Sequence, residues 1–65
     1  MKTFGERLKE LRVNIGVTQA TLAHYMNVDV VTVCHWEKSK QEPSIDALKK
    51  LYEFFRISST DLLGF

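Results

Sequence analysis

The chain of 65 residues lacks most features that hold very small domains together or attach them to membranes. Its single cysteine, Cys34, cannot form an intramolecular disulfide, and no Cys/His cluster has the spacing of a structural zinc site. No apolar run approaches the roughly 18 residues of a membrane span, and the N-terminus lacks the apolar stretch of a signal peptide. These absences predict one cytoplasmic domain, residues 1–65, held by packing alone, without a cofactor, metal or membrane partner.

The chain also has no large excess of charge of either sign, because nine basic and eight acidic side chains leave a net charge of +1. The distribution is uneven. Residues 17–37 contain no Lys or Arg and carry −2 from Asp29 and Glu37. The positive charge lies on either side: four basic against two acidic side chains in residues 1–16, and two against one in residues 38–43. The lysines and arginines that an anionic partner could contact therefore lie outside residues 17–37.

Apolar side chains recur at helical spacing along nearly the whole chain, which predicts an all-α fold. A first stripe runs from Phe4 to Ile15, and Gly16 is placed to end this helix. Thr3 and Glu6 have the spacing of a capping box at its start. We therefore expect an N-terminal helix with one inward face.

Two short helices follow, over 19–26 and 30–37. Thr18 and Asp29 precede them as N-caps, and Asn27 tolerates the positive φ of a tight turn. Beyond a polar loop, Ser44 caps a longer helix whose apolar face runs from Ile45 to Phe55. A last short turn is expected over residues 59–63. The pattern predicts five helical segments.

Two short helices joined by about three residues have the layout of a helix-turn-helix unit, here about residues 18–37. Ala23 stands where the two helices cross closely and a larger side chain would separate them. Further characteristic positions are Arg7 to Arg12, Gly16 to Gln19, Leu22, Val33, Trp36-Glu37, Pro43-Ser44 and Ser58 to Gly64. With these residues the chain resembles the lambda-repressor/Cro-like (XRE) helix-turn-helix family over about 4–64, and the resemblance implies a compact five-helix bundle.

The resemblance implies a transcriptional regulator, expected to repress, that inserts its third helix into the major groove of double-stranded DNA. The positions that match DNA-base contacts are Gln19, Val30, Val31, Thr32 and His35. Those that match DNA-phosphate contacts are Lys9, Thr18, Lys38 and Lys40. Arg12 and Glu37 match a structural ion pair. Asn27, Ser39 and Arg56 stand where the family often has Gly.

Operators of this family are usually roughly palindromic and bound by homodimers. Because valines cannot hydrogen-bond but can touch thymine methyl groups, thymine-rich half-sites are expected. The candidate dimer interface consists of Phe54, Ile57, Leu62 and Phe65. Enlargement of the core is the other explanation for these side chains, and the interface is favoured because so small a domain gains stability from oligomerisation.

Catalysis is not expected, because His24, Cys34 and His35 do not combine with a base or carboxylate into a reactive set. No small-molecule substrate is expected either. The competing hypothesis is a protein-interaction module, antitoxin-like or an adaptor, whose DNA face has been weakened. The −2 charge of residues 17–37 supports this alternative, since phosphate neutralisation supplies most non-specific DNA affinity.

Overall fold

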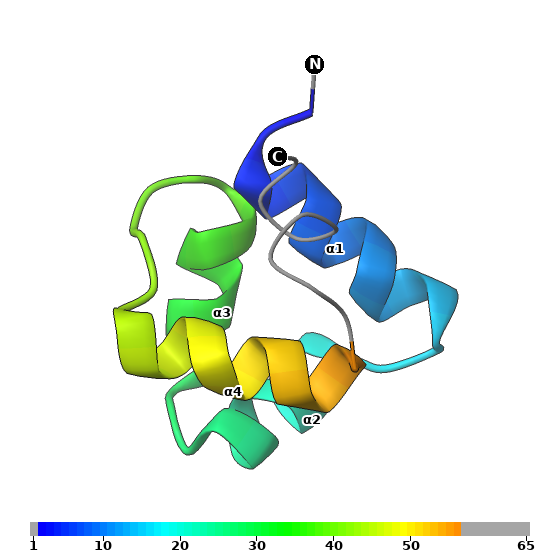
Figure 1. Ribbon diagram of the computed structural model, residues 1–65. Coiled ribbons are helices and arrows are strands. Elements are labelled where there is room, and N and C mark those ends of the chain that lie inside the picture. The colour runs from blue at the N-terminus through cyan, green and yellow to red at the C-terminus, as the bar shows by residue number, and fades with distance from the viewer. Residues whose placement is uncertain (1, 57–65) are drawn as a thin grey trace.

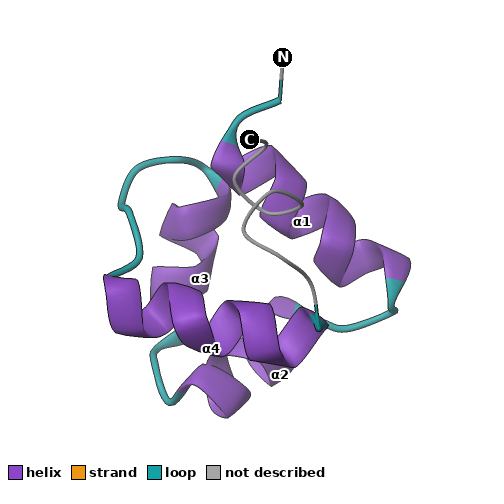
Figure 2. Cartoon of the chain, in the orientation of Figure 1, coloured by secondary structure: helices purple, strands orange, loops and turns teal. Residues whose placement is uncertain are grey.

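The computed structural model describes residues 2–56, which form four helices joined by short loops (Figure 1). The helices are α1 (Phe4–Asn14), α2 (Gln19–Met26), α3 (Val30–Glu37) and α4 (Ile45–Phe55). Figure 2 shows no strand in this part of the chain, so the all-α expectation is confirmed. The expected fifth element, residues 59–63, lies outside the described residues.

Each helix begins at the polar residue that the sequence provides for it. The hydroxyls of Thr18 and Ser44 accept hydrogen bonds from the backbone N–H three residues ahead, at 3.1 Å in both cases. Thr3 and Glu6 form the expected capping box. The hydrogen bond from the backbone N–H of Thr3, and next that from its side chain, lowers the pKa of Glu6 from its ordinary value. Asp29 caps α3 by accepting from the N–H two residues ahead, at 2.9 Å.

The first three helices end in the same left-handed motif. Gly16, Asn27 and Ser39 have φ values of 73°, 57° and 58°. In each case the next residue donates its N–H back to the helix, as Lys40 does to the carbonyl of His35 at 2.9 Å. The positions where the family often has Gly therefore keep the glycine-like conformation. Asn tolerates it, whereas Ser39 is strained.

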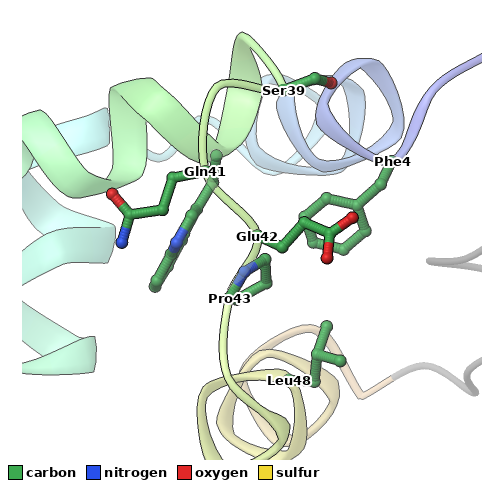
Figure 3. A pocket seen from close by; sticks show the side chains of 7 residues that line it. Phe4, Ser39, Gln41, Glu42, Pro43 and Leu48 are labelled. Carbon is green, nitrogen blue, oxygen red and sulfur yellow. The ribbon is translucent and has the colours of Figure 1, made fainter.

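The core forms where α3 packs against both α1 and α2, and where α4 packs against α2 (Figure 1). Its buried side chains are Leu8, Leu22, Ala23, Met26, Val33, Trp36 and Leu51. Trp36 also forms one wall of a pocket of about 360 Å³. Figure 3 shows Phe4, Pro43 and Leu48 among the other side chains that line it. No helix in residues 2–56 has the length and apolarity to cross a membrane.

Two isoleucines that the periodicity places on inward faces are exposed instead. Ile15 follows the last residue of α1, and Ile45, 73% exposed, is the first residue of α4. Helical spacing alone would place both side chains on the buried stripe. However, each lies at a helix end, where the neighbouring helices no longer cover the stripe, so the expectation was wrong for both.

Gly5 sets how closely α1 and α3 approach. It is buried, and a Cβ added to it would lie 2.3 Å from the carbonyl oxygen of Glu37 and 2.6 Å from that of Trp36. Backbone atoms cannot rotate away as a side chain can. The start of α1 therefore rests directly on the C-terminal end of α3, the helix that the sequence assigns to DNA recognition.

Candidate nucleic-acid interface

Helices α2 and α3 form a helix-turn-helix unit around a tight turn at residues 27–29. Asn27 takes the left-handed conformation, and the N–H of Val28 donates to the carbonyl of Ala23 at 3.0 Å. Ala23 is buried at the contact between the two helices, as its small size suggested. The turn thus fixes α3 relative to α2 by backbone geometry and close packing together.

The outer face of α3 is mainly apolar and uncharged. Val30 and Val31 are exposed, Val31 by 53%, and Thr32 and His35 are half-buried. On the opposite face, Val33, Trp36 and Glu37 are buried. The four candidate base-contact residues of α3 thus retain accessible surface, and what they offer is methyl groups, one hydroxyl and one imidazole.

The start of α2 carries two candidate contacts that are already engaged. The Thr18 hydroxyl accepts from the N–H of Thr21, and it donates to the Thr21 hydroxyl oxygen at 3.0 Å. Gln19 is half-buried, and its Nε2 donates to Oε1 of Glu37 at 2.9 Å. Neither side chain is a free surface group, so any DNA contact must be compatible with these internal bonds.

Arg12 and Glu37, which were expected to pair, form a buried ion pair between α1 and α3. Arg12 donates from Nε to Oε2 of Glu37 at 2.6 Å and from Nη2 to Oε1 at 3.1 Å. Its Nη1 donates to the carbonyl of Val17 at 2.8 Å, in the loop before α2. With Gln19 bound to the same carboxylate, this cluster ties three helices together.

The candidate phosphate contacts flank the unit, and α3 carries no Lys or Arg. Lys38 and Lys40 are exposed in the loop that follows α3. Lys9 is exposed on α1, where it shares a shallow hollow with Glu6 and Glu10. The acidic neighbours of Lys9 weaken the local positive potential, so the loop lysines are the stronger electrostatic attraction for a phosphate.

Phe54 is the one member of the candidate dimer interface among the described residues; Ile57, Leu62 and Phe65 lie outside them. It is half-buried, with its ring 4.7 Å from that of Tyr25 and 5.0 Å from that of Phe55. The ring therefore has partners within its own chain.

Two features of this region were not predicted from the sequence. The close approach at Gly5 had one available signal, because a glycine in the first turn of a helix often marks a packing constraint. The hydrogen bond between Gln19 and Glu37 had none, since 18 residues separate the two side chains and no local pattern links them.

The geometry is that of a helix-turn-helix domain. The sequence matches the helix-turn-helix family over residues 8–62, and the chain belongs to this family. This confirms the resemblance to lambda-repressor/Cro-like proteins.

Three similar proteins illustrate the relationship. The chain is 33% identical over 61 residues to the HTH-type transcriptional activator BcrR of Enterococcus faecalis, covering 94% of this chain and 30% of BcrR. It is 34% identical over 62 residues to the HTH-type transcriptional regulator ImmR of Bacillus subtilis (strain 168), covering 95% and 49%. Among solved structures, it resembles the P22 c2 repressor protein in complex with a synthetic operator. The TM-score is 0.89 and the identity 30%, with 97% and 96% of the two chains covered. The chain thus spans half or less of the two regulators BcrR and ImmR.

Proposed function

We propose that this chain is the sequence-specific DNA-binding domain of a cytoplasmic transcriptional regulator, and that it docks α3 in the major groove. The observation that carries the proposal is the exposed face of α3. Val30 and Val31 stand outward from a helix whose other face is locked into a helix-turn-helix core. The similar P22 c2 repressor was solved in complex with a synthetic operator, which supports the same role for this fold. Repression by occlusion of promoter DNA is the proposed mode, and it includes no chemical step.

The proposed base contacts on α3 are two apolar and two polar side chains, and a fifth contact comes from α2. Val30 and Val31 would contact thymine methyl groups, which project into the major groove. His35 would donate to a guanine, more strongly when protonated, and Thr32 would add a hydroxyl. Gln19 would contact a base edge from the start of α2. Two adjacent exposed valines favour thymine-rich half-sites.

The proposed phosphate contacts are few, which sets the salt dependence of binding. Lys38 and Lys40 would flank the groove after α3, Lys9 would reach the backbone from α1, and Thr18 would contact a phosphate from the start of α2. With so few cations per chain, few counterions are released on binding. We therefore expect weak non-specific binding and a shallow dependence of affinity on salt.

Selection from a random pool of duplex DNA, at low and then near-physiological salt, tests the proposal. Enrichment of a thymine-rich site that survives the higher salt supports it. Replacing Val31 with Ser should then relax the preference at one thymine by ~1 kcal/mol. The matched control is Val13→Ser, because Val13 is equally exposed, at 56%, but lies on α1 outside the helix-turn-helix unit. Equal effects of the two substitutions would contradict the proposed contact.

We propose that the regulator binds a roughly palindromic operator as a homodimer, with Phe54, Ile57, Leu62 and Phe65 at the interface. Doubling the footprint would offset the small number of cations in one chain. Sedimentation equilibrium measures the state of the wild type and of Phe54→Glu, while circular dichroism checks that the variant stays folded. A monomeric wild type in the presence of its operator would exclude the homodimer. A folded variant that still dimerises would exclude the interface.

A protein-interaction module is the second candidate function. The observation that favours it is the net charge of −2 on residues 17–37, which include the whole helix-turn-helix unit. Such a domain would enrich no DNA motif at any salt concentration, whereas a DNA reader would. Absence of saturable DNA binding, together with stoichiometric capture of a protein partner, would replace the leading proposal with this one.

A further inference from the structure

One carboxylate at the end of α3 accepts hydrogen bonds from side chains on two other helices, α1 and α2. Glu37, with its side chain 3% exposed, accepts from Nε and Nη2 of Arg12 and from Nε2 of Gln19. Arg12 neutralises the charge and holds the carboxylate in place from α1. Gln19, the first residue of α2, contacts the same carboxylate from the other side of the unit's turn. The carboxylate is therefore a fixed point against which the Gln19 side chain is oriented.

The chemistry of a carboxylate decides which end of the Gln19 carboxamide faces it. An ionised carboxylate only accepts hydrogen bonds, so the NH₂ group must point toward Glu37 and the carbonyl oxygen must point away. The planar amide cannot be reversed without setting two oxygens against each other. No hydrogen bond from the described residues reaches Oε1 of Gln19, and this atom is not among the buried side-chain atoms that lack a partner. Oε1 is thus left as an accessible acceptor.

We propose that Glu37 is a positioning residue for base recognition: it fixes the Gln19 carbonyl outward, so that Gln19 selects an exocyclic amino group. This inference rests on the proposed DNA-binding function. The group selected is the N6 amino of adenine or the N4 amino of cytosine, because both present a donor in the major groove. Guanine O6 and thymine O4 are acceptors, and the fixed carbonyl oxygen repels them.

A glutamine without such a partner reads both classes of base, since rotation of the carboxamide exchanges donor and acceptor. The Glu37 carboxylate removes this freedom. Phosphate oxygens also only accept, so the outward carbonyl oxygen cannot bind them, and the group of Gln19 that could is the second N–H of the same carboxamide. The outward carbonyl oxygen therefore assigns to Gln19 a contact with a hydrogen-bond donor, which a base amino group supplies and a phosphate does not.

Base analogues test the contact on the unaltered protein. The first step compares the selected sites of the wild type and of Gln19→Ala, which locates the base pair that Gln19 reads. At that pair, adenine is replaced by purine, which lacks the N6 amino group, or cytosine by pyrimidin-2-one, which lacks the N4 amino group. We expect the affinity of the wild type to fall about tenfold and that of Gln19→Ala to stay unchanged. The analogue that weakens binding identifies which of the two amino groups is the partner.

Two results would overturn the inference while leaving DNA binding intact. One is a wild type that binds its site but tolerates every analogue. The other is a Gln19→Ala variant that loses affinity equally for all sequences, which is the behaviour of a phosphate contact. A wild type that binds no DNA saturably refutes instead the proposed function on which the inference rests.

Glu37→Gln tests the positioning role itself. A glutamine at this position can donate or accept, so it allows both orientations of the Gln19 carboxamide. We expect the preference for an amino base over a carbonyl base to fall about tenfold at the Gln19 pair and at no other position. In a Gln19→Ala background the same substitution should change no preference. An equal loss at all positions would assign Glu37 a purely structural role, and if Glu37→Gln does not fold, the analogue series on the wild type decides.

Discussion

Replacing Gly5 with Ala should destabilise the domain, although alanine is the better helix former. The added Cβ would lie 2.3 Å and 2.7 Å from the carbonyl oxygen and carbon of Glu37, and 2.6 Å from the carbonyl oxygen of Trp36. All are backbone atoms at the end of α3, so the helices themselves must separate. Overpacking of this kind costs about 1–3 kcal/mol, and rigid neighbours place the cost near the upper end.

Helix propensity acts in the opposite direction. An alanine in place of glycine gains at most about 1 kcal/mol in a helix, which leaves a net loss near 2 kcal/mol for Gly5→Ala. For a domain of this size, that loss lowers the Tm by roughly 8–16 °C. Thermal unfolding followed by circular dichroism measures it.

Gly16→Ala is the matched control, because a Cβ at Gly16 meets nothing within 4 Å while φ is +73°. Its cost is confined to backbone strain, about 1 kcal/mol. The Gly5 variant should therefore be the less stable of the two. A Gly5→Ala protein that melts at or above the wild-type temperature would refute the argument that close backbone contact limits the approach of α1 to α3.

Two further predictions concern strain and buried charge. Ser39→Gly should raise the free energy of unfolding by about 0.5–1 kcal/mol because Ser39 has φ 58°, whereas Ser39→Ala keeps the Cβ and should give no gain in urea denaturation. Arg12→Met leaves the Glu37 carboxylate buried without its cation and should cost about 3–5 kcal/mol, comparable to the whole stability of so small a domain. The double variant Arg12→Met/Glu37→Met should recover most of that loss, and a single variant as stable as the wild type would show that the pair is dispensable.

The family and the shape of the helix-turn-helix unit were predictable because local residues encode them. Thr18 and Asp29 mark the starts of α2 and α3, and Asn27 marks the turn between them. These signals act over one to four residues, so they are visible in a linear sequence. The small Ala23 at the helix crossing could also be identified, because the family pattern fixes its place within the motif.

The sequence by itself thus determined where the described helices begin and end, which residues cap them, and which face of α3 carries Val30 and Val31. Only the tertiary structure decided the exposure of Ile45, the close approach at Gly5 and the orientation of Gln19 by Glu37. The physical reason is distance along the chain. Capping and helical periodicity depend on near neighbours, whereas these three features depend on how separate helices come to lie against one another.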